Sequence, residues 1–556
     1  MQVAIYEILQ QGAPHGMKKA DIILRGNAIF DAISDHPAGG FVAVADSRIL
    51  AIGKNGGGEY IGADTKVCDL KDKLIMPGFH DSHVHLTMSG MYRVCGNLID
   101  AKSEEEACKK LADFIGKNPT NDPWIIGFSW HHVFWNNKTL PTKSSLDKYF
   151  PDRPVLLLNA DCHGAWVNTR GLEIAGITKN TPDPYGGYFE RDEHGEPTGF
   201  LCESAIGPVG KFAFNFTFEQ EMRYVKTFKK EAARLGITSV NDLMPFFHGN
   251  MGNVETYSKL DRSGELTVRI NAAPNLLGDL DEVCRLRDRC TSEKITVGLL
   301  KQFLDGVGPT HTALMLEDYS DAPGNRGISL SDLEVIRKAV SEAHKKGLSV
   351  KLHSCGDASA RLALDYYEEA IKLHGKNECR HAIEHLEVVS PQDIPRFREL
   401  GVIPSMQPEH IALTQAFSEN PYPEKFGPER IKMSWPCKTL LDAAGVIAIG
   451  SDCPVVDNNP FLEIFRAVSR VHNDGEPKGG WNPSEKLTMA EVLKGYTYGS
   501  AYGVRRENDL GTLAAGKLAD IAVADRNLFA LDDIWEIMKA RVCMTVMDGK
   551  IIHEEL

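Results

Sequence analysis

The sequence lacks any apolar run long enough to span a membrane, and we expect no secretory leader. A transmembrane helix needs about 20 consecutive apolar residues, and no stretch of the 556 residues approaches that length. The opening residues, MQVAIYEILQQGAPHG, have no basic start followed by a long apolar segment, as a signal peptide would. We therefore expect a protein without a membrane partner.

The sequence is also short of positive charge and of paired cysteines. Lys and Arg number 62 against 76 Asp and Glu, which gives a formal charge of −14. Such a surface repels phosphate backbones, so we expect no nucleic-acid partner. The twelve cysteines contain no Cys-x-x-Cys pair, which is typical of reduced thiols in a cytoplasmic protein.

What the sequence does contain is a regular alternation of apolar strand candidates with helical patterns. Alternating strands and helices predict a parallel sheet, and eight such units predict a closed (β/α)8, TIM-like barrel in the α/β class. A capped helix is expected from about Ser331 to Lys346. The strand candidates are the segment before His83 and seven more: GITSVNDL (236–243), ELTVRINAAPN (265–275), ITVGLLKQFLDG (295–306), LSVKLHSCGD (348–357), CRHAIEHLEVVS (379–390), GVIPSMQPEH (401–410) and GVIAIGSDCPVV (445–456).

The two ends of the chain have a different sequence pattern, in which short strand candidates are separated by turn residues. Residues 1–77 and 510–556 are predicted to form one composite β-sandwich domain, because chain termini often lie close together. The barrel is expected to occupy residues 78–509. A long segment at about 88–235, rich in aromatic residues, interrupts the alternation of strands and helices. We expect an insertion there, after the first strand.

The segment LIMPGFHDSHVHLTMSG places two histidines at the end of the first strand. Residues two apart in a strand point to the same face, so His83 and His85 are positioned to share one cation. Neutral imidazole is a good ligand for zinc. Alone, the pair is explained more often by surface or capping histidines than by a metal site.

Other strands of the predicted barrel carry polar residues at matching places. His353 ends the fifth strand candidate, His385 the sixth and Asp452 the eighth, while Lys301 lies inside the fourth between apolar neighbours. Each one alone could be a satisfied core residue or a helix cap. Their common position at strand ends favours one site at the mouth of the barrel.

Several motifs make the chain similar to a known family. PGFHDSHVH, HSCGDASA, IEHLE, GSDCPV and GTLAAGKLADIAVAD resemble the amidohydrolase superfamily, and within it the amidohydrolase-3, or YtcJ-like, family. The resemblance extends through the insertion. It implies a metal-dependent hydrolase of amide or related non-peptide C–N bonds, acting on a small molecule such as an N-substituted formamide or another N-acyl amine.

The resemblance also implies roles for particular residues. The metal ligands would be His83, His85, His353, His385 and Asp452, holding one or two divalent ions, expected to be zinc. Asp452 would take the proton of the attacking water and pass it to the leaving nitrogen.

The insertion and the loops supply candidates for substrate contact. His163 matches a family histidine and would contact the substrate or its oxyanion, or else only pack the insertion on the barrel. Trp130 and His311 are expected to bind substrate, although most aromatic residues of the insertion are expected to form its own core. His311 stands where relatives often have arginine, and this departure prevents copying substrate preference from them.

Lys301 allows a more specific hypothesis. A buried lysine has a lowered pKa, and a neutral amine beside metal ions can take up carbon dioxide as a carbamate that bridges two ions. Alternatively, Lys301 pairs with Asp305 or another acid, or Glu203 supplies the bridging carboxylate.

Two other functions remain open at this point. The same site could serve deamination, lactone hydrolysis or decarboxylation, or the barrel could be a non-catalytic binding or regulatory protein. A retained ligand set argues against the last. From the family we expect a homodimer.

Overall fold

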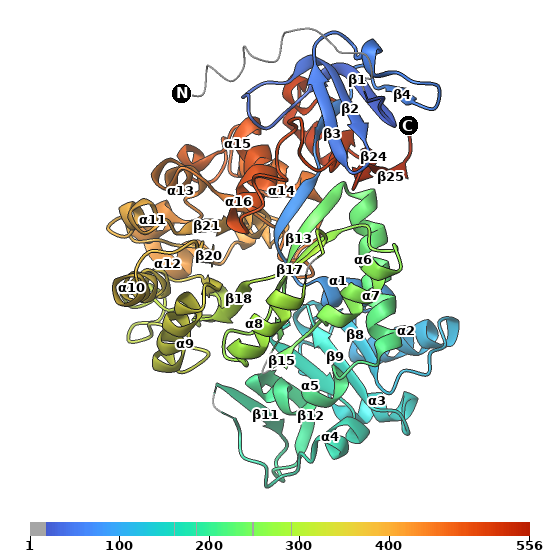
Figure 1. The fold of residues 1–556 in the computed structure, drawn as a ribbon. Helices are drawn as coiled ribbons and strands as arrows, with labels where there is room; N and C mark the ends of the chain where they lie inside the picture. Colours follow the sequence, from blue (N-terminus) through green and yellow to red (C-terminus); the bar gives the residue numbers. More distant parts are fainter. Residues whose placement is uncertain (1–17, 161, 185, 247–248, 291) are drawn as a thin grey trace.

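The computed structural model describes residues 18–556 except 161, 185, 247–248 and 291 (Figure 1). Parallel strands form its centre, in two ladders ordered β17-β16-β13-β6 and β18-β19-β20-β21-β22. Bridges between Asn275 and Lys301 and between Val84 and Cys453 join the two ladders into a ring. The barrel strands are β6 (Phe79–Val84), β13 (Ile237–Leu243), β16 (Arg269–Ala273), β17 (Ile295–Val297), β18 (Leu299–Phe303), β19 (Ser349–Ser354), β20 (Ala382–His385), β21 (Ile403–Met406) and β22 (Ala448–Ile449).

The predicted barrel is therefore confirmed, with its eight strand positions. The fourth position is divided into β17 and β18 around Gly298. All residues of β13 and β19 are buried, because helices cover the outside of the ring and side chains fill the inside. A small two-stranded ladder, β14 (Pro245–Phe246) with β15 (Gly249–Asn250), follows β13.

Helices follow the strands on the outside of the ring. The expected helix after β18 is capped by Asp332, whose carboxylate accepts hydrogen bonds from the Glu334 and Val335 amides. The helices are α6 (Phe218–Arg234), α7 (Val254–Arg262), α8 (Leu280–Arg289), α9 (Leu333–Lys345), α10 (Asp357–His374), α11 (Ile394–Leu400), α12 (Tyr422–Arg430), α13 (Cys437–Ala444), α14 (Pro460–Ser469), α15 (Met489–Lys494) and α16 (Ser500–Gly503). None of the helices in the described part of the chain is long and apolar enough to cross a membrane.

Strands from both ends of the chain form one further sheet. Its order is β25-β24-β23-β5-β1-β2-β3, with β4 paired to β1. The buried Arg269 guanidinium ties this sheet to the barrel, because it lies 2.8 Å from Asp520 and 3.2 Å from Asp548. The strands are β1 (Ile22–Ile29), β2 (Ala38–Ala45), β3 (Arg48–Gly53), β4 (Lys66–Asp69), β5 (Leu74–Pro77), β23 (Ile521–Ala524), β24 (Val542–Met547) and β25 (Lys550–Glu554).

The segment between β6 and β13 contains a sheet of its own, ordered β11-β12-β10-β9-β8-β7. Figure 1 shows it at the opposite end of the molecule from the terminal sheet. Its strands are β7 (Gly96–Asn97), β8 (Ile125–Trp130), β9 (Val155–Asn159), β10 (Gly164–Val167), β11 (Gly187–Arg191) and β12 (Pro197–Glu203), and its helices are α1 (Leu86–Val94), α2 (Glu104–Lys117), α3 (Lys143–Tyr149), α4 (Thr169–Ala175) and α5 (Gly207–Ala213).

Candidate metal centre

Closure of the barrel brings the first and last strands together. The Asp452 amide donates to the His83 carbonyl at 2.7 Å, and the His85 amide donates to the Cys453 carbonyl at 3.0 Å. Through this pairing the His83 Nε2 and the His85 Nε2 each lie 3.1 Å from Asp452 Oδ1. The structure therefore brings three of the sequence-predicted ligands into one cluster.

The second nitrogen of each imidazole is held by a different partner. His83 Nδ1 lies 2.7 Å from Glu384 Oε2, and His85 Nδ1 donates to the Leu243 carbonyl at 2.6 Å. These contacts fix both rings with Nε2 toward Asp452, as partners of metal-binding histidines do. Lys351 Nζ lies 2.7 Å from the other Glu384 oxygen. Burial raises the pKa of Glu384, but the charges of Lys351 and His83 outweigh it and hold that pKa well below its usual range.

The arrangement around Asp452 fits a cation better than a set of hydrogen bonds. Despite the two nitrogens at 3.1 Å, Asp452 Oδ1 has no hydrogen-bond partner among the described residues. An unpaired buried oxygen costs about 1–3 kcal/mol. Ligands of a tetrahedral zinc ion with bonds of about 2.0–2.1 Å are themselves about 3.4 Å apart, so the observed spacing suits such an ion.

Two more histidines face the other oxygen of Asp452. His385, at the end of β20, places Nδ1 4.0 Å from Asp452 Oδ2, and His410 places Nε2 3.7 Å from it. His410 lies in a short 3-10 helix, Pro408–Ala412, after β21. His410 is not among the ligands predicted from the sequence. The signal available was its place at the end of the seventh strand candidate, where the other strands carry ligands.

His353 lies beside this cluster but does not join its ligand atoms. Its ring centroid is 4.3 Å from that of His385. Its Nε2 lies 3.2 Å from the Gly306 carbonyl and 3.4 Å from Cys355 Sγ. At the barrel mouth, the groups of described residues whose ligand atoms lie close enough to share an ion are His83, His85 and Asp452, and His385, His410 and Asp452, without His353.

Lys301 is fully buried on β18, and its Nζ has no hydrogen-bond partner among the described residues. Burial lowers the pKa of Lys301 to about 8, against the opposing charges of Glu384 and Asp452. The alternative pairing with Asp305 is not observed. The Asp305 carboxylate instead accepts hydrogen bonds from the Cys355 and Gly356 amides and the Ser359 hydroxyl.

The predicted substrate residues lie in three different settings. His163 Nδ1 lies 2.8 Å from Glu203 Oε2 in the insertion, so the Glu203 carboxylate contacts His163. His311 Nε2 lies 2.9 Å from the Asp321 carboxylate, and Lys425 Nζ lies 2.8 Å from the same group.

Trp130 requires a correction. It was expected to line a substrate pocket, but it is fully buried in the core of the insertion and packs on Trp135, Trp166 and Phe200. Its indole N–H donates to the Leu157 carbonyl at 2.9 Å. A ring of this size gains most from complete burial when its N–H finds a partner.

A second histidine cluster needs no metal ion. The Val350 amide donates to His381 Nδ1 at 3.1 Å, so the His381 Nε2 carries hydrogen and donates to His344 Nδ1 at 2.9 Å. The His344 Nε2 then donates to the Gly375 carbonyl at 2.9 Å. Burial raises the pKa of the nearby Cys379 thiol to about 11, which disfavours the thiolate that a metal would need.

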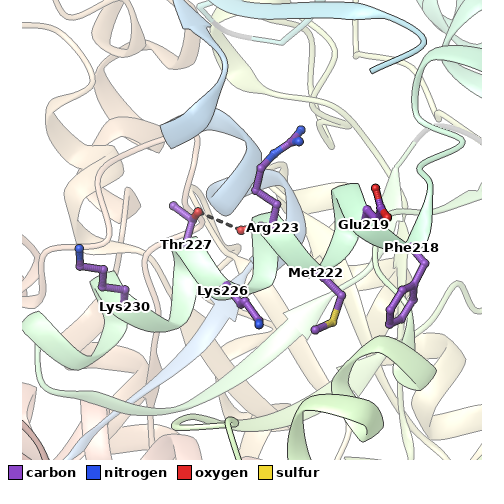
Figure 2. A pocket seen from close by; sticks show the side chains of 7 residues that line it. All are labelled: Phe218, Glu219, Met222, Arg223, Lys226, Thr227 and Lys230. Atoms are coloured by element: carbon purple, nitrogen blue, oxygen red, sulfur yellow. Dashed lines mark hydrogen bonds between the residues drawn. The ribbon is translucent and has the colours of Figure 1, made fainter. Parts of the chain in front are cut away.

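A surface groove lies elsewhere, along α6, and no ligand candidate contributes to it (Figure 2). Within it, the Thr227 hydroxyl donates to the Arg223 carbonyl at 2.9 Å. The residues that line the groove are Phe218, Glu219, Met222, Arg223, Lys226, Thr227 and Lys230.

Comparison with known proteins agrees with this geometry. A family model described as "Amidohydrolase family" matches residues 66–553. Protein LONG AFTER FAR-RED 3 of Arabidopsis thaliana is 32% identical over 96% of this chain and 92% of its own length. The putative amidohydrolase YtcJ of Bacillus subtilis is 30% identical, covering 89% of this chain and 92% of that protein. The N-substituted formamide deformylase of Arthrobacter pascens is 26% identical, covering 92% and 94%.

A solved structure has the same architecture. An uncharacterized metal-dependent hydrolase from Pyrococcus horikoshii superimposes with a TM-score of 0.76 and 26% identity, covering 92% of this chain and 98% of that one.

Proposed function

Because the chain belongs to the amidohydrolase family and is a metal-dependent hydrolase of non-peptide C–N bonds, we propose that it releases an amine from an N-substituted formamide or another N-acyl amine. The relative named N-substituted formamide deformylase supports this substrate class. The observation that carries the proposal is the cluster of His83, His85 and Asp452, with two imidazole nitrogens 3.1 Å from one carboxylate oxygen.

His83, His85 and Asp452 would hold the ion, which we propose to be zinc. A bound zinc ion supplies a nucleophile at neutral pH and polarises the scissile carbonyl. Glu384 and the Leu243 carbonyl hold the imidazoles in the orientation that binding requires.

Proton transfer falls to Asp452. Burial raises the pKa of Asp452, but its contacts with His83 and His85 hold that pKa well below its usual range, so the group is an ionised acceptor. Asp452 would take a proton from the attacking water and deliver it to the leaving nitrogen.

The remaining assignments are part of the same proposal. His163 would contact the substrate or its developing oxyanion, and His311 would bind the substrate's outer part. Lys301, His353 and His385 are candidate ligands for a second ion, and a carbamate on Lys301 would bridge two ions. We further propose a cytoplasmic homodimer with a small-molecule substrate, in which the terminal strands form a composite sandwich.

A substrate screen tests the proposal. Metal-loaded enzyme is offered N-formyl amines, N-acyl amines and N-acyl amino acids, and amine release is measured beside the Asp452→Asn variant. We expect turnover of at least one class by the parent protein and its loss in the variant. Equal amine release by both proteins, or none from any class by protein with full metal content, would contradict the assignment.

A further inference from the structure

Glu203 ends β12 in a backbone conformation that residues other than glycine rarely adopt. Its φ is 51° and its ψ is −125°, the mirror image of extended backbone, which glycine alone adopts without strain. Packing enforces this turn, because a Cβ on Gly187 of the neighbouring strand would approach the Cys202 carbonyl oxygen to 2.5 Å and the Ala205 nitrogen to 2.6 Å. Strained residues held by their surroundings are concentrated at functional sites.

The turn directs the Glu203 carboxylate to His163. Glu203 Oε2 lies 2.8 Å from His163 Nδ1, and the Glu203 amide donates to the His163 carbonyl at 2.9 Å. Because a carboxylate only accepts hydrogen bonds, the contact assigns a hydrogen to Nδ1. The two side chains are 25% and 30% exposed, so their ion pair contributes little to stability. Folding alone therefore does not explain the strained turn.

Helix α1 connects this part of the insertion to the metal centre. It begins directly after His85. One turn later, the Ser89 hydroxyl donates to the carbonyl of Cys453 at 2.9 Å. Cys453 follows Asp452 in the sequence, so this face of α1 lies against the turn that positions the predicted proton acceptor.

Tyr92 lies between the two regions. It is one turn beyond Ser89 on α1, and its hydroxyl lies 2.5 Å from Ser129 Oγ on β8. Burial raises the pKa of Tyr92, and the nearby thiols of Cys162 and Cys453 raise it further. Tyr92 is therefore close both to the residue that precedes His163 and to the residue that follows the predicted proton acceptor. The pair of Glu203 and His163 lies beside the mouth of the barrel.

A bridging carboxylate is the other role open to Glu203, and the geometry does not favour it. Glu203 belongs to none of the groups of described residues whose ligand atoms lie close enough together to share an ion. Its Oε2 contacts His163 instead.

We infer that Glu203 is a positioning residue that acts through His163, holding the imidazole with Nε2 toward the acyl oxygen of the substrate. The inference rests on the proposed function, in which His163 contacts the developing oxyanion. With Nδ1 donating to the carboxylate, a doubly protonated ring presents its Nε2–H to the oxyanion, and Glu203 balances its charge. A donor stabilises the transition state most when it is held in place before the charge develops.

A double-mutant comparison of metal-loaded enzyme tests the inference. The variants are Glu203→Gln, Glu203→Ala, Glu203→Gly, His163→Ala and Glu203→Ala/His163→Ala. Glu196→Gln is the matched control, because it removes an exposed carboxylate of the insertion that lies 3.5 Å from Lys179. Steady-state kinetics, bound metal by elemental analysis and thermal unfolding are measured for each protein.

We expect His163→Ala to lose about 10²–10³-fold in kcat, the range for loss of one oxyanion donor. Glu203→Ala should lose nearly as much at almost unchanged KM, because the contact forms in the transition state. Glu203→Gln, which keeps an acceptor, should lie between Glu203→Ala and the parent. The double variant should be no slower than His163→Ala, since residues that act as a unit are not additive.

Glu203→Gly separates positioning from a structural role. Glycine removes the strain of the turn together with the carboxylate. This variant should unfold at or above the temperature of the parent, yet lose as much kcat as Glu203→Ala. Bound metal should equal that of the parent in every Glu203 variant and in the control.

Nitrogen NMR of histidine-labelled protein tests the contact without relying on activity. The His163 signal is assigned by its absence from His163→Gln. We expect hydrogen on Nδ1 in the parent and in Glu196→Gln, and loss of this fixed assignment in Glu203→Ala.

Four results would overturn the inference. These are parental kcat in Glu203→Ala, a double variant clearly slower than His163→Ala, loss of metal in Glu203→Gln, which would make Glu203 a ligand, and unchanged Nδ1 hydrogen in Glu203→Ala. Each of them leaves the proposed function standing if the parent releases amine. No amine release by the fully metal-loaded parent would remove the proposed function, and the role of Glu203 in hydrolysis with it.

Discussion

Replacement of Glu384 by Gln tests whether Glu384 orients His83 for metal binding. Glu384 is fully buried, with one oxygen 2.7 Å from His83 Nδ1 and the other 2.7 Å from Lys351 Nζ. Removing such an outer partner of a metal-binding histidine typically costs about 10–100-fold in metal affinity. We expect a value near tenfold for Glu384→Gln, because the amide oxygen can still accept from His83. Glu384→Ala, which removes the acceptor, should lose about 100-fold in metal affinity.

The same change should affect folding through Lys351. Breaking one partner of a buried ion pair costs about 3–5 kcal/mol, because the remaining charge is left uncompensated. Glu384→Gln should therefore lower the free energy of unfolding of the metal-free protein. The double variant Glu384→Gln/Lys351→Met removes both charges, and it should recover much of this stability without recovering metal affinity.

Two measurements separate these effects. Competition with a chromophoric chelator gives metal affinity, and urea unfolding of metal-free protein gives stability. Unchanged affinity in both single Glu384 variants would refute the orienting role of Glu384. An unchanged free energy of unfolding in Glu384→Gln would show that the buried Lys351 does not need the negative charge of Glu384.

Four further predictions follow from the same geometry. Asp452→Asn should retain its fold but lose about 10²–10⁴-fold in turnover through loss of the proton acceptor; steady-state kinetics with metal analysis checks this, and near-normal turnover would exclude the proposed base. His83→Ala and His85→Ala should each lower metal occupancy, and full occupancy in both by elemental analysis would contradict a shared ion. Lys301→Ala should lose one metal ion and its activity, with partial rescue by a short-chain carboxylate; ¹³C NMR of the parent protein in labelled bicarbonate should reveal the carbamate, and its absence would leave Lys301 a plain lysine. Burial lowers the pKa of His381 to about 3 in the folded state, below the value of about 6.5 expected when unfolded. The unfolded chain therefore binds the extra proton, and stability should fall as pH decreases from about 6.5 toward 3, by up to about 1.4 kcal/mol per pH unit. Urea unfolding of His381→Gln should give a shallower pH dependence, and equal slopes would count against this assignment.

The strands of the barrel could be predicted because each is a short apolar run between turn signals. β13 and β19, for example, are buried along their whole length, and their sequences ITSVNDL and SVKLHS place apolar residues between polar ones. The division of the fourth strand at Gly298 was not predicted, because periodicity does not distinguish one long strand from two short ones.

The site could be predicted only where ligands lie in or just after the last residues of a strand. His83, His385 and Asp452 stand at such positions, and the structure brings them together. His410 follows Pro408 in a short 3-10 helix, where no periodic pattern indicates the direction of a side chain. Trp130 was misplaced for a related reason: composition identifies an aromatic residue, but only packing determines whether it lines a pocket or fills a core.

Backbone conformation at the strand ends explains how these side chains converge. His385 has a φ of 73° and Asp452 a φ of 62°, in the left-handed region that costs a residue other than glycine about 1–3 kcal/mol. Hydrogen bonds hold both turns: the His385 amide donates to Gln407 at 3.0 Å, and the Asp452 amide donates to the His83 carbonyl at 2.7 Å. Those partners come from the next strand around the ring in each case, so the strained turns depend on barrel closure. The ligand cluster is therefore a property of the assembled barrel, and no single motif contains enough of the chain to form it.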